Sequence, residues 1–442
     1  MNRPPISMGV AGAFSVRGNE SFGGRRELPL IAPLSHLAAA IIGMLFFGAF
    51  AGVALPAAFI TPFNPHTLAD VHMAVIGWIT MSVLGASYQL TPVILAAPLV
   101  WSKFVRWQFP IYFIGAVTLI FGFWYMRPWY IVTGGSLIFL AVAHHVTVLI
   151  ASIIKSPNKP LTAKFILTAL IYLLFVISFG ITAGLNLQYG FFGQWTNSFI
   201  LTHLTIGIAG WLLTILTGVS YTLIPMFSLT HGHSQKLGEY VLIINTSGVV
   251  VFALSTVFAV PWFPYIGMLV LLAGLALYAY DVWQMYRKRL RKKLEPAQLH
   301  AIAGMAYLCV GFPFAMALIY RASYTPHLFI AAGVMIIVGA FGQHITGYMY
   351  KIVPFLVWHT RYGPDAGIKK VPLLKDLLDH RATITALILT NIGILIIVFG
   401  ALFSSGAVVT AGSVVLELGF VVIGYVIFRV LSHLRLADIF ST

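Results

Sequence analysis

Charged residues and cysteine are both scarce in this chain of 442 residues. Only 8% of the residues are charged and 60% are apolar, whereas soluble domains usually carry about 25% charged residues. This composition excludes a water-soluble globular protein. The single cysteine, Cys309, excludes an internal disulfide framework, a C-x-x-C-H haem attachment and a metal site built from cysteines.

Long apolar runs fill most of the chain. A helix needs about 20 apolar residues to cross the hydrocarbon core of a bilayer. Runs of this kind lie near residues 32–57, 68–98, 108–126, 129–154, 163–187, 197–228, 239–260, 263–284, 299–320, 326–356, 381–403 and 408–433. The sequence therefore predicts an all-α polytopic membrane protein with about 12 transmembrane helices, in which residues 31–442 form a single transmembrane domain.

The positive charge is unevenly distributed between the predicted loops. Of the 26 lysines and arginines, all but Arg127 and Arg321 lie in the N-terminal tail, in links after even-numbered spans or at the inner ends of spans. This bias predicts that both termini are cytoplasmic in the plasma membrane. Residues 1–30 lack an apolar segment and are expected to be a mobile cytoplasmic tail. Anionic lipid accounts for the net charge of +15, so no nucleic-acid partner is expected.

The second, sixth and tenth spans share a spaced motif. Span 2 contains Gly77-Trp78, Gly85-x-Ser87-Tyr88 and Pro92, and span 6 repeats these residues at identical spacing as Gly210-Trp211, Gly218-x-Ser220-Tyr221 and Pro225. Span 10 retains Gly339, Gly347, Tyr350 and Pro354. We expect the glycines to allow close helix packing and the prolines to end the helices.

This repeat predicts three units of four helices arranged with pseudo-threefold symmetry. Most secondary transporters consist of two halves, so the repeat disfavours that class. A twelve-span subunit in which helices 2, 6 and 10 begin with histidine and end in Gly-x-x-Tyr-x-x-x-Pro resembles subunit I of the haem–copper oxidases and nitric oxide reductases. It also resembles the related NnrS-type haem and copper membrane proteins.

The resemblance implies that histidines in the outer parts of these helices hold a b-type haem. His72 lies where the family has its second-helix ligand. Aligned on the prolines, His203 is displaced by two residues and His327 by seven. All three are candidate haem ligands, and Arg321 is a candidate partner for a haem propionate.

A deeper set of histidines lies about 15 Å above the inner face. His344 is a further haem candidate, and the adjacent His144 and His145 are candidate metal ligands, with copper as the metal. The alternative is that these rings are neutral and bonded to serine, threonine or carbonyl groups. Six other histidines are placed in inner links or at inner span ends, as peripheral residues: His231, His233, His300, His359, His380 and His433. His36, near the inner start of span 1, and His66, in the first outer loop, are weaker candidates.

The oxidase family carries a pair of histidines on helix 7, but span 7 contains none here. A complete copper centre is therefore not expected. The leading hypothesis is a haem-binding membrane protein that acts in electron transfer or in handling nitric oxide or oxygen. If it is an enzyme, it is an oxidoreductase, working alone, as a homo-oligomer or with other respiratory subunits. Two alternatives are a haem or metal transporter or chaperone without redox turnover, and a structural subunit without a cofactor.

Overall fold

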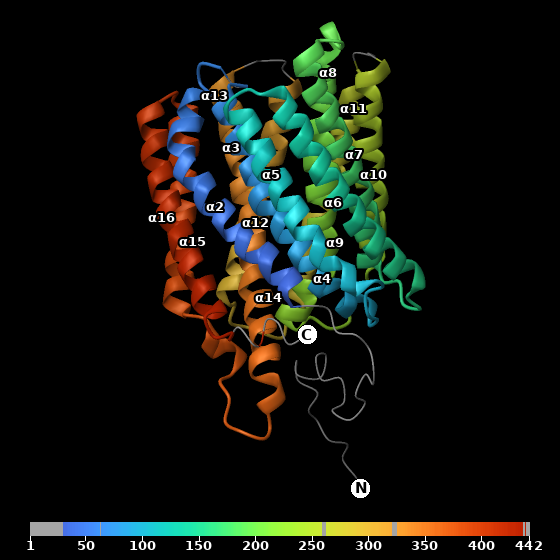
Figure 1. Cartoon of the computed structure of the whole chain (residues 1–442), viewed down its shortest axis with the longest axis vertical. Helices are drawn as coiled ribbons and strands as arrows, with labels where there is room; N and C mark the ends of the chain where they lie inside the picture. The colour runs from blue at the N-terminus through green and yellow to red at the C-terminus, as the bar shows by residue number, and fades with distance from the viewer. Residues whose placement is uncertain (1–29, 62, 259–261, 321–324, 436–437, 439–442) are drawn as a thin grey trace.

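The computed structural model describes residues 30–61, 63–258, 262–320, 325–435 and 438. Within these residues, twelve helical spans are long and apolar enough to cross a membrane. They run side by side along one axis (Figure 1). This confirms the all-α polytopic architecture expected from the apolar runs. Residues 1–29, most of the predicted tail, lie outside the described part of the chain, as does Arg321.

The helices fall into three units of four spans, and the second span of each unit is continuous through three labelled segments. The first unit contains α2 (Ile31–Ala57), α3 (Pro65–His72), η1 (Met73–Thr80), α4 (Met81–Leu95), α5 (Gln108–Trp124) and α6 (Pro128–Lys155). The second contains α7 (Leu161–Tyr189), α8 (Thr196–Thr205), η4 (Ile206–Leu213), α9 (Thr214–Ser228), α10 (Lys236–Phe258) and α11 (Phe263–Arg287). The third contains α12 (Pro296–Tyr320), α13 (Pro326–Val334), η5 (Met335–Gly342), α14 (Gln343–Arg361), α15 (His380–Leu402) and α16 (Gly406–Leu431).

We call α3–η1–α4, α8–η4–α9 and α13–η5–α14 the central spans. Each contains a π-helical segment of 8 residues, beginning at Met73, Ile206 and Met335. These starting points are separated by the same intervals as the three motif prolines. The π-helical segments therefore belong to the repeat. Segments of this kind are often found at functional sites.

The first helix of each unit packs against a motif glycine of the central span. A Cβ atom added to that glycine would lie 2.2–3.1 Å from the Cβ of the facing residue. The pairs are Gly85 with His36, Gly218 with Phe165, and Gly347 with His300. The three contacts place His36, Phe165 and His300 at equivalent positions of the pseudo-threefold arrangement.

The third and fourth helices of each unit also pack alike. A Cβ on Gly134 of α6, Gly267 of α11 or Gly412 of α16 would lie 2.4–2.7 Å from a backbone nitrogen of the preceding helix. Because the three helices pack in the same register, the residues eleven positions after these glycines are equivalent to one another in the three units. Those residues are His145, Tyr278 and Ile423.

The motif prolines behave differently in the third unit. The expectation that they end their helices holds closely for Pro92 and Pro225, because α4 and α9 stop at Leu95 and Ser228. The residues that follow, Ala96 and Leu229, adopt left-handed conformations with φ of 50° and 55°. The expectation is wrong for Pro354, since α14 continues to Arg361.

Each unit begins and ends at the same end of the bundle (Figure 1). We call this the basic end, because it holds nearly all of the described lysines and arginines. The opposite, neutral end carries the connections α2–α3, α5–α6, α7–α8, α10–α11 and α15–α16.

Candidate functional site

His72 ends α3 just before the first π-helical segment. Its Nδ1 lies 2.7 Å from the carbonyl oxygen of Leu68, so Nδ1 carries the hydrogen and donates it. Nε2 is then left with a free lone pair. The ring stacks on Phe123 of α5, with 4.3 Å between ring centroids, and the side chain retains some exposed surface.

His203 of α8 lies close enough to His72 for a positive charge on one imidazole to disfavour a charge on the other. Its ring packs on α7 at Gly180, where an added Cβ would lie 3.2 Å from the imidazole Cε1. Glycine therefore makes room for this ring. The structure thus brings together two of the four predicted haem-binding histidines, one from each of the first two units.

The other two predicted histidines occupy different places. His327 is in the first turn of α13, where its ring contacts Phe59 with 6.1 Å between centroids. His344 lies in α14, ten residues nearer the basic end than the position equivalent to His72. This is about 15 Å along a helix, so one haem cannot join His344 to His72.

His344 nonetheless makes the same backbone hydrogen bond as His72. Its Nδ1–H donates to the carbonyl oxygen of Ala340 at 2.8 Å, which leaves Nε2 unprotonated. The residue is 1% exposed. A Cβ at Gly304 of α12 would lie 2.3 Å from the imidazole Nδ1, so the ring is seated against α12.

The two predicted metal ligands on α6 have different surroundings. His145 is fully buried, its Nε2 lies 3.0 Å from Ser87 Oγ, and its ring packs edge-on against Tyr88. His144 is half-buried. No group of three or more His, Cys, Asp or Glu suited to a metal ion occurs among the described residues.

Three histidines that the sequence analysis placed at the periphery or ranked as weak are buried. His36 and His300 have no exposed surface, and each packs edge-on against the motif tyrosine of its unit, Tyr88 or Tyr350. His233 Nε2 lies 2.8 Å from Oδ1 of the buried Asp281. The helix boundaries alone could not reveal the burial of His36 and His300, because it follows from the close helix contacts at Gly85 and Gly347.

In the second unit the hydroxyl of the motif tyrosine has a hydrogen-bond partner. Tyr221 donates its hydroxyl hydrogen to Asp281 Oδ2 at 2.9 Å. By contrast, neither oxygen of the buried Asp70 has a hydrogen-bond partner among the described residues. Asp70 does not orient His72, which donates to the Leu68 carbonyl oxygen instead. Asp70 occupies the position in unit one that His203 occupies in unit two.

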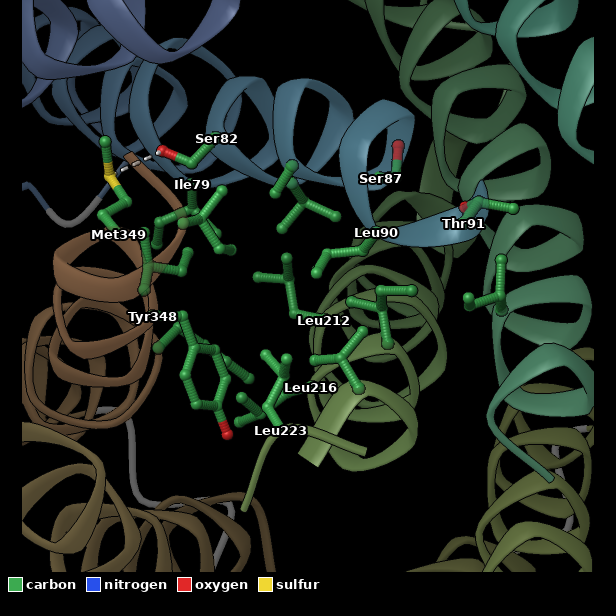
Figure 2. A pocket seen from close by; sticks show the side chains of 18 residues that line it. Ile79, Ser82, Ser87, Leu90, Thr91, Leu212, Leu216, Leu223, Tyr348 and Met349 are labelled. Carbon is green, nitrogen blue, oxygen red and sulfur yellow. Dashed lines mark hydrogen bonds between the residues drawn. The ribbon is translucent and has the colours of Figure 1, made fainter. Parts of the chain in front are cut away.

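An apolar cavity of about 70 Å³ lies between the three central spans (Figure 2). Equivalent positions of the three units line it in layers. These layers are Ile79, Leu212 and Phe341; Val83, Leu216 and Ile345; Ala86, Val219 and Tyr348; and Leu90, Leu223 and Ile352. The cavity therefore lies on the pseudo-threefold axis. No histidine lines it, but Ser87 on its wall is the hydrogen-bond partner of His145.

Comparison with known proteins adds no family assignment. No family model matches the chain, and no curated protein matches it.

Proposed function

We propose that this protein binds b-type haem at the neutral end of the bundle, where the imidazoles of His72 and His203 would hold the iron. The observation that carries the proposal is the proximity of these two imidazoles, which come from central spans of different units. Ionisable groups inside membrane helices are costly and are usually functional. Imidazole is a common axial ligand of haem iron.

The state of His72 supports a ligand role. Metal-bound histidines usually donate their second ring N–H to a carbonyl or carboxylate, which fixes the tautomer. His72 makes this bond to Leu68, and its Nε2 is free to bind iron. Phe123 offers an aromatic face beside the ring, and Gly180 keeps α7 clear of His203.

A bound haem held by two imidazoles would supply one-electron chemistry. The protein would hold the ring, exclude water and set the reduction potential through the axial imidazoles. The apolar cavity on the pseudo-threefold axis suits a small apolar molecule such as nitric oxide or oxygen, because dry apolar cavities bind such molecules. Copper-assisted oxygen reduction is not part of the proposal, since α10 has no histidine in its sequence.

We place the protein in the plasma membrane, with the basic end in the cytoplasm. The concentration of lysine and arginine at that end supports this orientation. Electron transfer would take place in contact with other respiratory subunits or within a homo-oligomer.

The test is an absorption spectrum of protein purified after expression with added haem. The wild-type protein should show a Soret band and the spectrum of a low-spin, bis-imidazole haem. His72→Ala and His203→Ala should lose the band or change its spin state, while His327→Ala should retain it. Absence of haem from the wild-type protein would overturn the proposal. Substoichiometric haem that exchanges freely with an acceptor would instead favour a transporter or chaperone.

A further inference from the structure

A second histidine cluster lies nearer the basic end, between α2, α4 and α6. His36 and His145 pack edge-on against the same side chain, Tyr88, with ring centroids 5.9 Å and 4.5 Å from the tyrosine ring. The two imidazoles are near enough to each other for a positive charge on one to disfavour a charge on the other. All three residues are fully buried.

The tautomer of His36 is fixed by its helix. Its Nδ1 lies 2.7 Å from the carbonyl oxygen of Ala32, which only accepts hydrogen bonds, so Nδ1 carries the hydrogen. Nε2 therefore has a lone pair. This atom is buried and has no hydrogen-bond partner among the described residues. The side-chain amide of Gln108 lies beside the ring as a potential donor to Nε2, and its own nitrogen and oxygen are also buried without a hydrogen-bond partner among the described residues.

The tautomer of His145 is fixed through Ser87. The Ser87 hydroxyl donates its one hydrogen to the carbonyl oxygen of Leu84 at 2.8 Å. Ser87 Oγ must then accept the hydrogen of His145 Nε2, 3.0 Å away. The lone pair of His145 is consequently on Nδ1, which is also buried without a partner. A buried acceptor left unsatisfied costs about 1–3 kcal/mol, so two such atoms in one cluster require an explanation.

The second unit shows that packing does not need either imidazole, and the third unit shows that it does not need the one of His145. The positions equivalent to His36 and His145 hold Phe165 and Tyr278 in the second unit, and His300 and Ile423 in the third. The motif tyrosine is present in all three. Both histidines therefore occur together in only one of the three units of the described bundle. Phe165 and Tyr278 fill the same space in the second unit, and Ile423 replaces the second imidazole in the third.

The class of ligand follows from the charge and number of the donors. Two neutral imidazoles, each anchored by its other nitrogen, present the arrangement typical of metal-bound histidine. Among the described residues, no carboxylate acts on the charge of either ring, and burying an uncompensated divalent charge is costly. Zinc usually takes four ligands in such sites, whereas copper(I) is monovalent and accepts fewer. We propose that His36 Nε2 and His145 Nδ1 bind one copper(I) ion.

This site differs from the predicted His144–His145 pair, because the second ligand is His36 on α2. It is also independent of the proposed haem site, which lies on other residues at the neutral end. One water molecule that donates a hydrogen to each lone pair is the competing occupant, and the experiment distinguishes it from copper.

The experiment incubates the purified full-length protein anaerobically with tetrakis(acetonitrile)copper(I) and ascorbate, removes free metal by gel filtration, and measures copper per chain. We expect about one bound copper per wild-type chain. His36→Phe and His145→Ile, which copy Phe165 and Ile423, should each lose it. The matched control His144→Ala should retain it. Ser87→Ala, which removes the anchor of His145, should weaken binding by about 10- to 100-fold.

X-ray absorption of the copper-loaded wild-type protein gives a readout that does not depend on any variant folding. It should show copper(I) bound by two imidazole nitrogens. A wild-type protein that binds no copper, in which water alone fills the site, overturns the proposal. Equal copper in His36→Phe and wild type overturns it, as does zinc binding at the same stoichiometry. A wild-type protein that binds copper but no haem would overturn only the haem proposal.

Discussion

Trp211 in η4 donates its indole N–H to the hydroxyl oxygen of Thr80 in η1, with 3.1 Å between Nε1 and Oγ1. The bond joins π-helical segments of two different units, and both side chains are buried. It fixes the first two central spans relative to each other at the level of Ile79 and Leu212, which line the cavity.

Replacing Thr80 with valine should destabilise the protein. The variant keeps the shape of the side chain but leaves the Trp211 N–H without a partner, at a cost of about 1–2 kcal/mol. Thermal unfolding in detergent measures the change. Thr118→Val is the control, since Thr118 is exposed and bonds only to Ile114 of its own helix. Equal stability of the Thr80 variant and wild type would show that the bond does not join the units.

The close contact of Gly218 with Phe165 predicts that a larger residue at position 218 destabilises the protein. Gly218→Ala would place a Cβ 2.2 Å from Phe165 Cβ, so α7 and α9 must separate. Overpacking of this kind typically costs about 1–3 kcal/mol. In Gly333→Ala, an added Cβ meets nothing within 4 Å, and this variant should be as stable as wild type or slightly more stable. The same thermal assay compares them, and matching losses would contradict the packing at Gly218.

Asp379 caps α15 at the basic end and predicts a pH dependence. Hydrogen bonds from the backbone N–H groups of Ala382 and Arg381, with Arg429 nearby, lower the pKa of this carboxyl below its usual 3.8. A lowered folded-state pKa means that the carboxylate stabilises the fold above the unfolded-state pKa. That stabilisation is lost as the pH falls through the folded-state pKa.

Asp379→Asn isolates this effect, because asparagine is also a good N-cap but does not titrate. The difference in melting temperature between wild type and variant should be constant at neutral pH. It should change in favour of the variant below about pH 3.8. A difference that does not vary with pH would show that Asp379 has the same pKa in the folded and unfolded protein.

Much of the architecture could be predicted because membrane spans are long and their repeat is spaced along the sequence. The twelve spans follow from apolar length alone, and the units follow from Gly77, Gly85 and their equivalents. The π-helical segments could not be predicted, since no residue in them differs in kind from an α-helical residue. The continuation of α14 past Pro354 also had no local signal.

The candidate sites were harder to predict than the fold. His72 could be selected because it begins a motif-bearing span, but its pairing with His203 depends on how the first two units pack. His36 is only five residues into α2, a position that predicts solvent exposure. It is buried because Gly85 lets α4 approach it, and such an approach becomes visible only when both helices are placed.

The central claim is most directly tested by the haem content of the purified protein. Pyridine haemochrome analysis should give about one haem b per wild-type chain and little or none in a His72→Ala, His203→Ala double variant, with unchanged gel-filtration behaviour. Haem-free wild-type protein, or equal haem in the double variant and wild type, would contradict the account.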